Sequence, residues 1–288
     1  MYVHAASGFV CDPITDLERA KEELKQYTDY FFRRVNKFIL LSLLGVHRCV
    51  HERPADESVA VFLATENGNL GDTENVLRQI YRENSFPKPF NFINTMSNTA
   101  SFYVAQSLNT RGRSITVSSK ASSFERGLEM AMADLSLGQI REALVGGVDE
   151  AASSRDEFHN KYKAAPGHLK LVEGSSWMLL SAAPEGAMGE ILDVRTFSTF
   201  DEARAWADSL EPPLVLAFGI LVPMAEKDVW KQSLPHAEEF DYLGGYGFYD
   251  TAAAFAVCRF FEDFRGRTLV HVNKTPHGGY CLIGCRSY

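Results

Sequence analysis

The stretch from Ser114 to Leu135 constrains the fold most, because it contains a strand, a tight turn and a helix in immediate succession. Residues 114–117 are apolar and β-branched, as expected for a short buried strand. Residues 118–123 are mostly small, which allows the backbone to turn sharply. Apolar residues then recur at helical spacing. This spacing predicts a buried helix face made of Phe124, Leu128, Ala131, Met132 and Leu135.

The start of this helix is a typical place for a catalytic nucleophile, because unpaired N–H groups and the helix dipole favour negative charge there. Ser122 and Ser123 are therefore candidate nucleophiles, with Lys120 or His277 as the base. That arrangement would make an acyltransferase or a hydrolase. The local sequence lacks the Gly-x-Ser-x-Gly pattern of hydrolases. In the alternative interpretation, both serines cap the helix and pack closely.

Strand and helix patterns alternate along the rest of the chain, which predicts a layered α/β fold. Helices are expected over residues 16–30, 38–46, 71–81 and 252–261. Strands are expected over residues 5–10, 58–64, 143–151, 171–180, 212–222, 268–273 and 278–283.

Composition limits the possible partners and the compartment. The net charge of −8 argues against binding to nucleic acid or to an anionic membrane. The five cysteines include no CxxC pair, and no signal peptide precedes them, so we expect a cytoplasmic protein without a metal or another cofactor. The apolar run over residues 38–46 is too short to cross a bilayer.

The stretch over residues 116–124 resembles the nucleophile elbow of the β-ketoacyl synthases, which belong to the thiolase superfamily. Their pattern is close to Thr-Val-Ser-Thr-Ala-Cys-Ala-Ser-Gly, and its cysteine accepts the acyl group. An ungapped match places that cysteine on Ala121. Residues 143–151 similarly resemble the family's Ala-Gly-Gly-x-Glu segment. The resemblance extends over essentially the whole chain.

Two further motifs of the family carry the histidines that polarise the substrate carbonyl and stabilise the enolate. The resemblance places them on Phe218, before Gly219, and on Phe248, after Gly247. A phenyl ring has neither a proton to donate nor a lone pair to accept one. The resemblance thus implies that all three catalytic groups are absent.

The last family motif, Asn-x-Phe-Gly-Phe-Gly-Gly-Thr-Asn, corresponds to the stretch that begins at Asn273. The phenylalanine that gates the active site falls on a histidine, and a proline replaces a glycine, which predicts a stiffer loop. The gate loop is therefore expected at Pro276, His277, Gly278 and Gly279.

The resemblance implies a thiolase-like fold with five αβαβα layers and two similar halves, residues 1–183 and 184–288, in one compact unit. It also implies the role of a chain-length factor, a non-catalytic subunit that pairs with an active β-ketoacyl synthase in type II polyketide synthesis. The chain is similar to the short subunits of bacterial aryl polyene pathways. The alternatives are an autonomous serine enzyme using Ser122 or Ser123, and a purely structural ketosynthase partner.

The resemblance also indicates where the partner would bind. The helix after Gly71 is expected at the heterodimer interface, where it closes the acyl tunnel. The acidic acyl carrier protein should bind mainly to the partner, because the net charge of this chain is negative. The expected tunnel and interface residues are Thr73, Val76, Leu77, Ile80, Asn98, Ser114, Thr116 and Val117.

Overall fold

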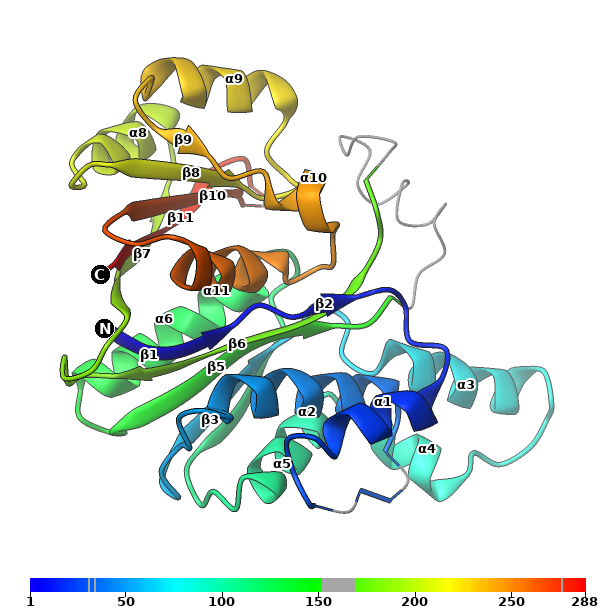
Figure 1. Cartoon of the computed structure of the whole chain (residues 1–288). Helices are drawn as coiled ribbons and strands as arrows, with labels where there is room; N and C mark the ends of the chain where they lie inside the picture. Colours follow the sequence, from blue (N-terminus) through cyan, green and yellow to red (C-terminus); the bar gives the residue numbers. More distant parts are fainter. Residues whose placement is uncertain (31, 34, 152–168, 276) are drawn as a thin grey trace.

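In the computed structural model, which describes residues 1–288 except 31, 34, 152–168 and 276, eleven strands form one continuous sheet (Figure 1). The strands are β1 (Tyr2–Ser7), β2 (Val10–Cys11), β3 (Ala60–Ala64), β4 (Ser114–Val117), β5 (Glu142–Asp149), β6 (Glu173–Ser181), β7 (Gly189–Phe197), β8 (Leu214–Phe218), β9 (Glu238–Glu239), β10 (Thr268–Lys274) and β11 (Tyr280–Ser287). The helices are α1 (Leu17–Leu24), α2 (Lys37–Val50), α3 (Leu70–Tyr81), α4 (Pro89–Asn94), α5 (Asn98–Ser107), α6 (Ser123–Ser136), α8 (Phe200–Asp208), α9 (Met224–Ser233), α10 (Tyr242–Tyr246) and α11 (Ala252–Asp263).

The sheet repeats one topology twice. In the first half, β4, β3 and β5 are parallel, and β6 and β1 continue the sheet with antiparallel pairing. In the second half, β9, β8 and β10 are parallel, and β11 and β7 continue it in the same way. The halves join where Tyr2 pairs with Glu190 and Val3 pairs with Gly189. The predicted boundary after residue 183 falls between β6 and β7, and this division stays our proposal.

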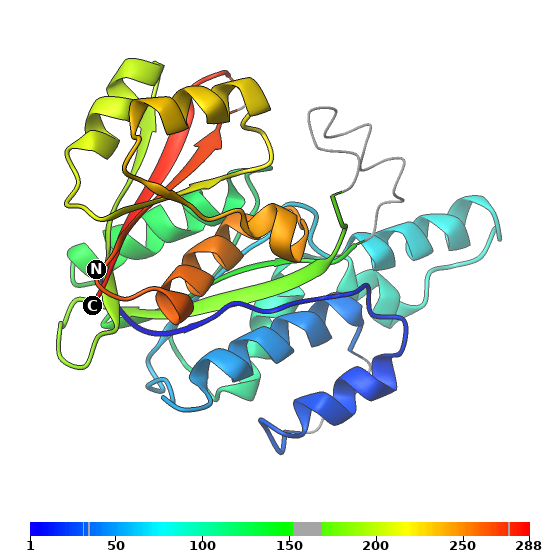
Figure 2. The same ribbon diagram turned by 45° about the horizontal axis from the view of Figure 1, so that its top comes forward.

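Helices and sheet halves stack in five layers (Figures 1 and 2). Helices α2 and α5 cover the outer face of the first half, α6 and α11 lie between the halves, and α8 and α9 cover the outer face of the second half. Three apolar cores fill the spaces between these layers. Successive side chains of strand β3 alternate between the two faces of the sheet. Phe62 faces the central core, while Val61 and Leu63 face the core under α2. The α/β fold with its five layers is thus confirmed.

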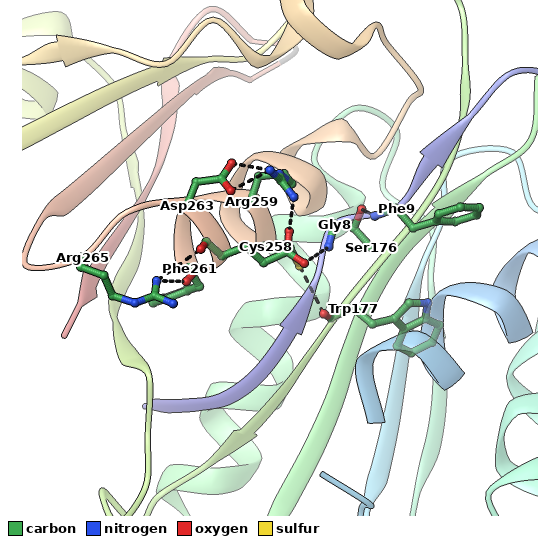
Figure 3. Close-up of polar contacts among 10 residues, drawn as sticks. Gly8, Phe9, Ser176, Trp177, Cys258, Arg259, Phe261, Asp263 and Arg265 are labelled. Atoms are coloured by element: carbon green, nitrogen blue, oxygen red, sulfur yellow. Dashed lines mark hydrogen bonds and ion pairs between the residues drawn. The ribbon is translucent and has the colours of Figure 1, made fainter. Parts of the chain in front are cut away.

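Helix α11 belongs to the second half but packs on β6 and β1 of the first. The thiol of Cys258 donates to the carbonyl oxygen of Trp177 at 3.3 Å. One turn later, the carboxylate of Glu262 accepts a hydrogen bond from the amide of Gly8 at 3.3 Å. Figure 3 shows these contacts beside the ion pair of Arg259 and Asp263. These contacts hold the middle layer against the first half of the sheet.

The predicted helices over residues 71–81 and 252–261 and the buried strand over 58–64 are confirmed with small shifts of their ends. The helix over residues 38–46 is longer than predicted and extends from Lys37 to Val50. At its start, the Asn36 side chain caps it by accepting from the amide of Ile39 at 2.8 Å.

Four predicted boundaries were wrong. The opening strand starts at Tyr2 and is interrupted at residues 8–9. Helix α1 ends at Leu24. After it, the amides of Gln26 and Tyr27 donate to the carbonyl oxygens three residues earlier, as in a 3₁₀ turn. Strand β8 ends at Phe218 because residues 219–223 turn away from the sheet, and β11 starts only after Gly278, whose φ is +88°.

Candidate functional site

The turn between β4 and α6 forms a sharp elbow. Lys120 has a φ of +51°, in the left-handed region that non-glycine residues seldom adopt. The hydroxyl of Ser123 stabilises this turn, because it donates to the carbonyl oxygen of Lys120 at 2.6 Å and accepts from the amide of Ser119 at 2.8 Å. The elbow predicted over residues 114–135 is therefore present as strand, turn and helix.

The capping interpretation of the two serines was wrong for their side chains. Ser122 occupies the N-cap position of α6 but makes no side-chain capping bond, and its buried hydroxyl has no hydrogen-bond partner among the described residues. The Ser123 hydroxyl bonds inside the turn. Within the described part of the chain, no hydrogen bond joins the hydroxyl of either serine to the side chain of a histidine, a lysine or a carboxylate residue. His277 and Lys120 are exposed.

Ala121 lies at the elbow and is partly exposed. Its carbonyl oxygen accepts a hydrogen bond from the side-chain amide of Asn273 at 3.1 Å. The same amide nitrogen donates to Glu125 Oε1 at 2.9 Å. Asn273 also lies close to Gly219, where an added Cβ would be only 2.4 Å from Asn273 Oδ1. Asn273 therefore holds together the elbow and the turn that follows Phe218.

The two phenylalanines at the expected histidine positions are both buried. Phe218 ends β8 and packs in the outer core of the second half. Phe248 lies in the central core with Phe124 of α6, and its backbone pairs with Lys170 and Val172. Apolar rings thus occupy both positions, one in the outer core of the second half and one in the central core.

The expected gate loop is a short turn between β10 and β11. The amide of Gly278 donates to the carbonyl oxygen of Thr275, and the amide of Thr275 donates to that of Gly279. His277 is exposed at the tip. Pro276 lies outside the described residues.

The expected interface residues lie on neighbouring elements, α3, α5 and β4. On α3, Val76 is buried and Thr73 is half-buried, whereas Leu77 and Ile80 are exposed by 47% and 40%. The hydroxyl of Ser101 on α5 bonds to that of Thr116 on β4 at 3.0 Å. The remaining members, Asn98, Ser114 and Val117, lie at the start of α5 or on β4.

Sequence reasoning missed the buried carboxylates near the elbow. Glu125 is fully buried, and its burial raises its pKa. Asp149, at the end of β5, is also buried, and burial together with the neighbouring Asp250 raises its pKa. A glutamate that interrupts the apolar face of a predicted helix could have revealed Glu125. The Asp149 carboxylate accepts hydrogen bonds from the Thr65 hydroxyl and from the amides of residues 66 and 67, and these partners, distant in sequence, could not be predicted from the local pattern.

A second buried group surrounds Lys37 at the start of α2. Its ammonium forms ion pairs with Glu173 on β6 and with Glu150 just after β5. Glu150 also accepts from the amide of Gly71 at 2.8 Å, and Glu173 accepts from the amides of Ile14 and Ala151. These contacts fix the start of α3 to the sheet, so this group is structural support for the expected interface.

The arrangement at the elbow offers little for acyl transfer. Ala121 carries only a methyl group, and Phe218 and Phe248 are buried phenyl rings. Outside residues 31, 34, 152–168 and 276, no cluster of three or more His, Cys, Asp or Glu side chains could hold a metal ion. In the same described ranges, no helix is long and apolar enough to span a bilayer.

Comparisons with known proteins place this geometry in context. Residues 34–159 match the model of the β-ketoacyl synthase N-terminal domain. A search of curated proteins found no significant match. The comparison of structures finds significant matches that the search of curated proteins does not, as expected where a fold is shared at low sequence identity.

Three similar structures are ketosynthases or their complexes. The ishigamide ketosynthase/chain length factor is 20% identical, with 88% of this chain and 81% of that chain covered and a TM-score of 0.68. A type II ketosynthase in complex with its acyl-carrier protein is 12% identical, with 100% and 99% covered and a TM-score of 0.71. A ketosynthase in complex with its chain length factor from Xenorhabdus doucetiae is 13% identical, with 99% of both chains covered and a TM-score of 0.54.

The repeated sheet topology, the elbow and these matches agree with one another. The chain has the thiolase-like fold of the β-ketoacyl synthases, and its residues 34–159 match the N-terminal domain of that family.

Proposed function

We propose that this chain is a non-catalytic subunit of the chain-length-factor type, which pairs with an active β-ketoacyl synthase and shapes its acyl tunnel. The product would be a polyketide or a fatty-acid-like polyene made by a type II system. The similar structures include ketosynthase/chain length factor pairs, which supports this class of partner.

The observation that carries the proposal is a large exposed apolar region over α3, α4, α5 and the segments between them. Phe86 is 98% exposed and Tyr81 is 77% exposed. Side chains of this size are seldom exposed together on a monomer, whereas obligate interfaces are rich in them. The apolar region consists of Leu77, Ile80, Tyr81, Phe86, Phe90, Phe92, Ile93, Met96 and Phe102.

The open edge of the sheet lies next to this apolar region. Strand β4 pairs with β3 on one side, and on its other side no strand pairs with it among the described residues. Helix α5 packs against β4. An uncovered edge strand invites pairing with another chain. We therefore place the partner against β4 and the apolar region, so that the interface includes Asn98, Ser114, Thr116 and Val117.

A cavity of about 530 Å³ opens beside the apolar region, between the starts of α2 and α3 and helix α4. Its lining includes Asn36, Asn75, Asn94 and Phe90, but not the α3 residues expected to close the tunnel. The exposed Leu77 and Ile80 would then form a tunnel end only together with the partner.

The non-catalytic part of the proposal rests on Ala121, Phe218 and Phe248. The first cannot form a thioester, and the other two cannot donate a hydrogen bond to an enolate. The alternative serine enzyme has less support, because neither the Ser122 nor the Ser123 hydroxyl bonds to a basic side chain within the described residues. A purely structural partner differs from the proposed subunit only in its effect on product length.

Reconstitution with candidate ketosynthases tests the proposal. We expect the isolated chain neither to condense nor to decarboxylate malonyl-carrier protein, and to form a stable complex with one ketosynthase that is then active. Turnover by the isolated chain that Ser122→Ala or Ser123→Ala abolishes would establish the serine enzyme instead. A well-behaved monomer that binds no ketosynthase at micromolar concentration would refute the pairing.

A further inference from the structure

A second cavity is lined mainly by residues of α9, α10 and the loops beside them. These helices lie in the other half of the molecule from α3 and α4 (Figure 1). It has a volume of about 530 Å³, within the usual range for small-molecule sites. The turn after Phe218, helix α9 and helix α10 form its walls. Its apolar lining consists of Leu169, Ile220, Val222, Met224 and Leu243.

Four charged side chains also line this cavity, and three of them have partners. Lys231 forms ion pairs with Glu239 at 3.0 Å and with Asp228 at 3.6 Å. Asp241 caps α10 by accepting from the amide of Gly244 at 3.0 Å. The ammonium of the fourth, Lys227, forms no ion pair or hydrogen bond with any described residue.

Lys227 is nevertheless half-buried. Its ammonium lies 5.8 Å from the centroid of the Phe218 ring, which is a weak substitute for an anion. Burial lowers its pKa, although Asp241 and Glu239 at longer range oppose this effect. A partly desolvated cation at the wall of an apolar cavity is thus the one charged group there that lacks a bonded counter-charge among the described residues.

We propose that this cavity binds a short aliphatic carboxylate, with the carboxylate on Lys227 Nζ and the hydrocarbon chain against Leu169, Ile220 and Val222. A singly charged head group fits the lining better than a phosphate dianion does. The carboxylates of Glu239 and Asp241 line the same cavity and would repel a second negative charge. The site is independent of the proposed subunit role, because none of its lining residues belongs to α3, α4, α5 or β4.

Octanoate titration by calorimetry tests the site, with octanol and inorganic phosphate as parallel probes. We expect the full chain to bind octanoate at least about tenfold more tightly than octanol, since a charged hydrogen bond is worth this much. Lys227→Met keeps the length of the side chain and removes its charge, so it should abolish this preference. Lys227→Arg should retain most of it.

The stability of each variant is measured by thermal unfolding, so that a folding defect is separated from lost binding. Lys227→Met should unfold like the wild type, because the lysine forms no ion pair with a described residue. Three results would overturn the inference: no octanoate binding at millimolar concentration, octanoate binding unaffected by Lys227→Met, or phosphate binding as tight as that of octanoate.

Discussion

The side-chain amide of Asn273 donates to the carbonyl oxygen of Ala121 at 3.1 Å, across 152 positions of sequence. This bond joins the last strands of the second half to the elbow of the first. It holds the backbone of the elbow in place at Ala121, whose side chain is only a methyl group. In the proposed non-catalytic subunit, the scaffold of the site would thus be present without the groups that perform the reaction.

Replacing Asn273 by alanine should destabilise the protein by about 1–3 kcal/mol, the typical cost of leaving a buried polar group unsatisfied. Glu125 would lose its side-chain partner while remaining fully buried. Urea unfolding measures the change. Asn75→Ala on the exposed surface of α3 is the matched control and should alter stability by less than about 0.5 kcal/mol. Equal effects of the two variants would contradict the role of Asn273.

Restoring a thiol at the elbow should not restore condensation. Ala121→Cys places a partly exposed cysteine beside a helix start, where thiols are reactive. Iodoacetamide should label it selectively, because burial raises the pKa of both Cys11 and Cys281 to about 12. Mass spectrometry should then find alkylated protein but no condensed product from malonyl-carrier protein, because Phe218 and Phe248 remain. A condensed product would show that the phenylalanines are not the obstacle.

A charge in the apolar region should weaken the complex with the ketosynthase. Leu77→Asp would bury a carboxylate in the proposed interface, and we expect the dissociation constant to rise by about tenfold or more. Val229→Asp on α9 is the control, since both leucine and valine are 47% exposed and α9 lies on the opposite side of the molecule (Figure 1). Surface plasmon resonance compares the two. Similar affinities for both variants would exclude α3 from the interface.

Smaller side chains at the same place should lengthen the product. Leu77→Ala and Ile80→Ala remove exposed side chains, so the isolated chain should lose less than about 0.5 kcal/mol of stability. If both side chains close the tunnel, each variant should admit about one more two-carbon unit, or roughly 2.5 Å of extended chain. Chromatography of products from the reconstituted pair measures this. Unchanged lengths with intact assembly would remove α3 from the tunnel and favour a purely structural partner.

Stability should depend on the protonation of Asp149. Burial and the nearby Asp250 raise its pKa in the folded protein, whereas its pKa in the unfolded chain is about 3.9. Above about pH 4 the folded state therefore retains a proton that the unfolded state has lost. The free energy of unfolding should then fall as the pH rises, until the raised pKa is passed.

Asp149→Asn should remove this contribution, so the variant should lose less stability than the wild type between pH 4 and neutrality. His47 and His271 act in the opposite direction, because burial lowers their pKa values to about 4 and 3. Both histidines are present in the two proteins, so the difference between the two curves isolates Asp149. A difference that stays constant with pH would show that Asp149 is ionised in the folded protein.

The sequence by itself determined the alternation of strands and helices, the elbow and the absence of a thiol at Ala121. These features depend on local patterns, such as the apolar period of Phe124, Leu128 and Leu135, which one segment carries alone. Strand β3 was readable for the same reason, since a strand buried on both faces is apolar throughout.

Only the tertiary structure decided which side chains remain uncovered and which charges remain unpaired. The apolar stripe on α3 has the same pattern whether it packs in a core or faces solvent, and the packing of neighbouring elements leaves Leu77 and Ile80 exposed. In the sequence alone, Lys227 has the pattern of an ordinary surface lysine. In the folded chain it lines a cavity together with the turn after Phe218 and helix α10. Exposure and pairing depend on residues distant in sequence, so no local pattern could supply them.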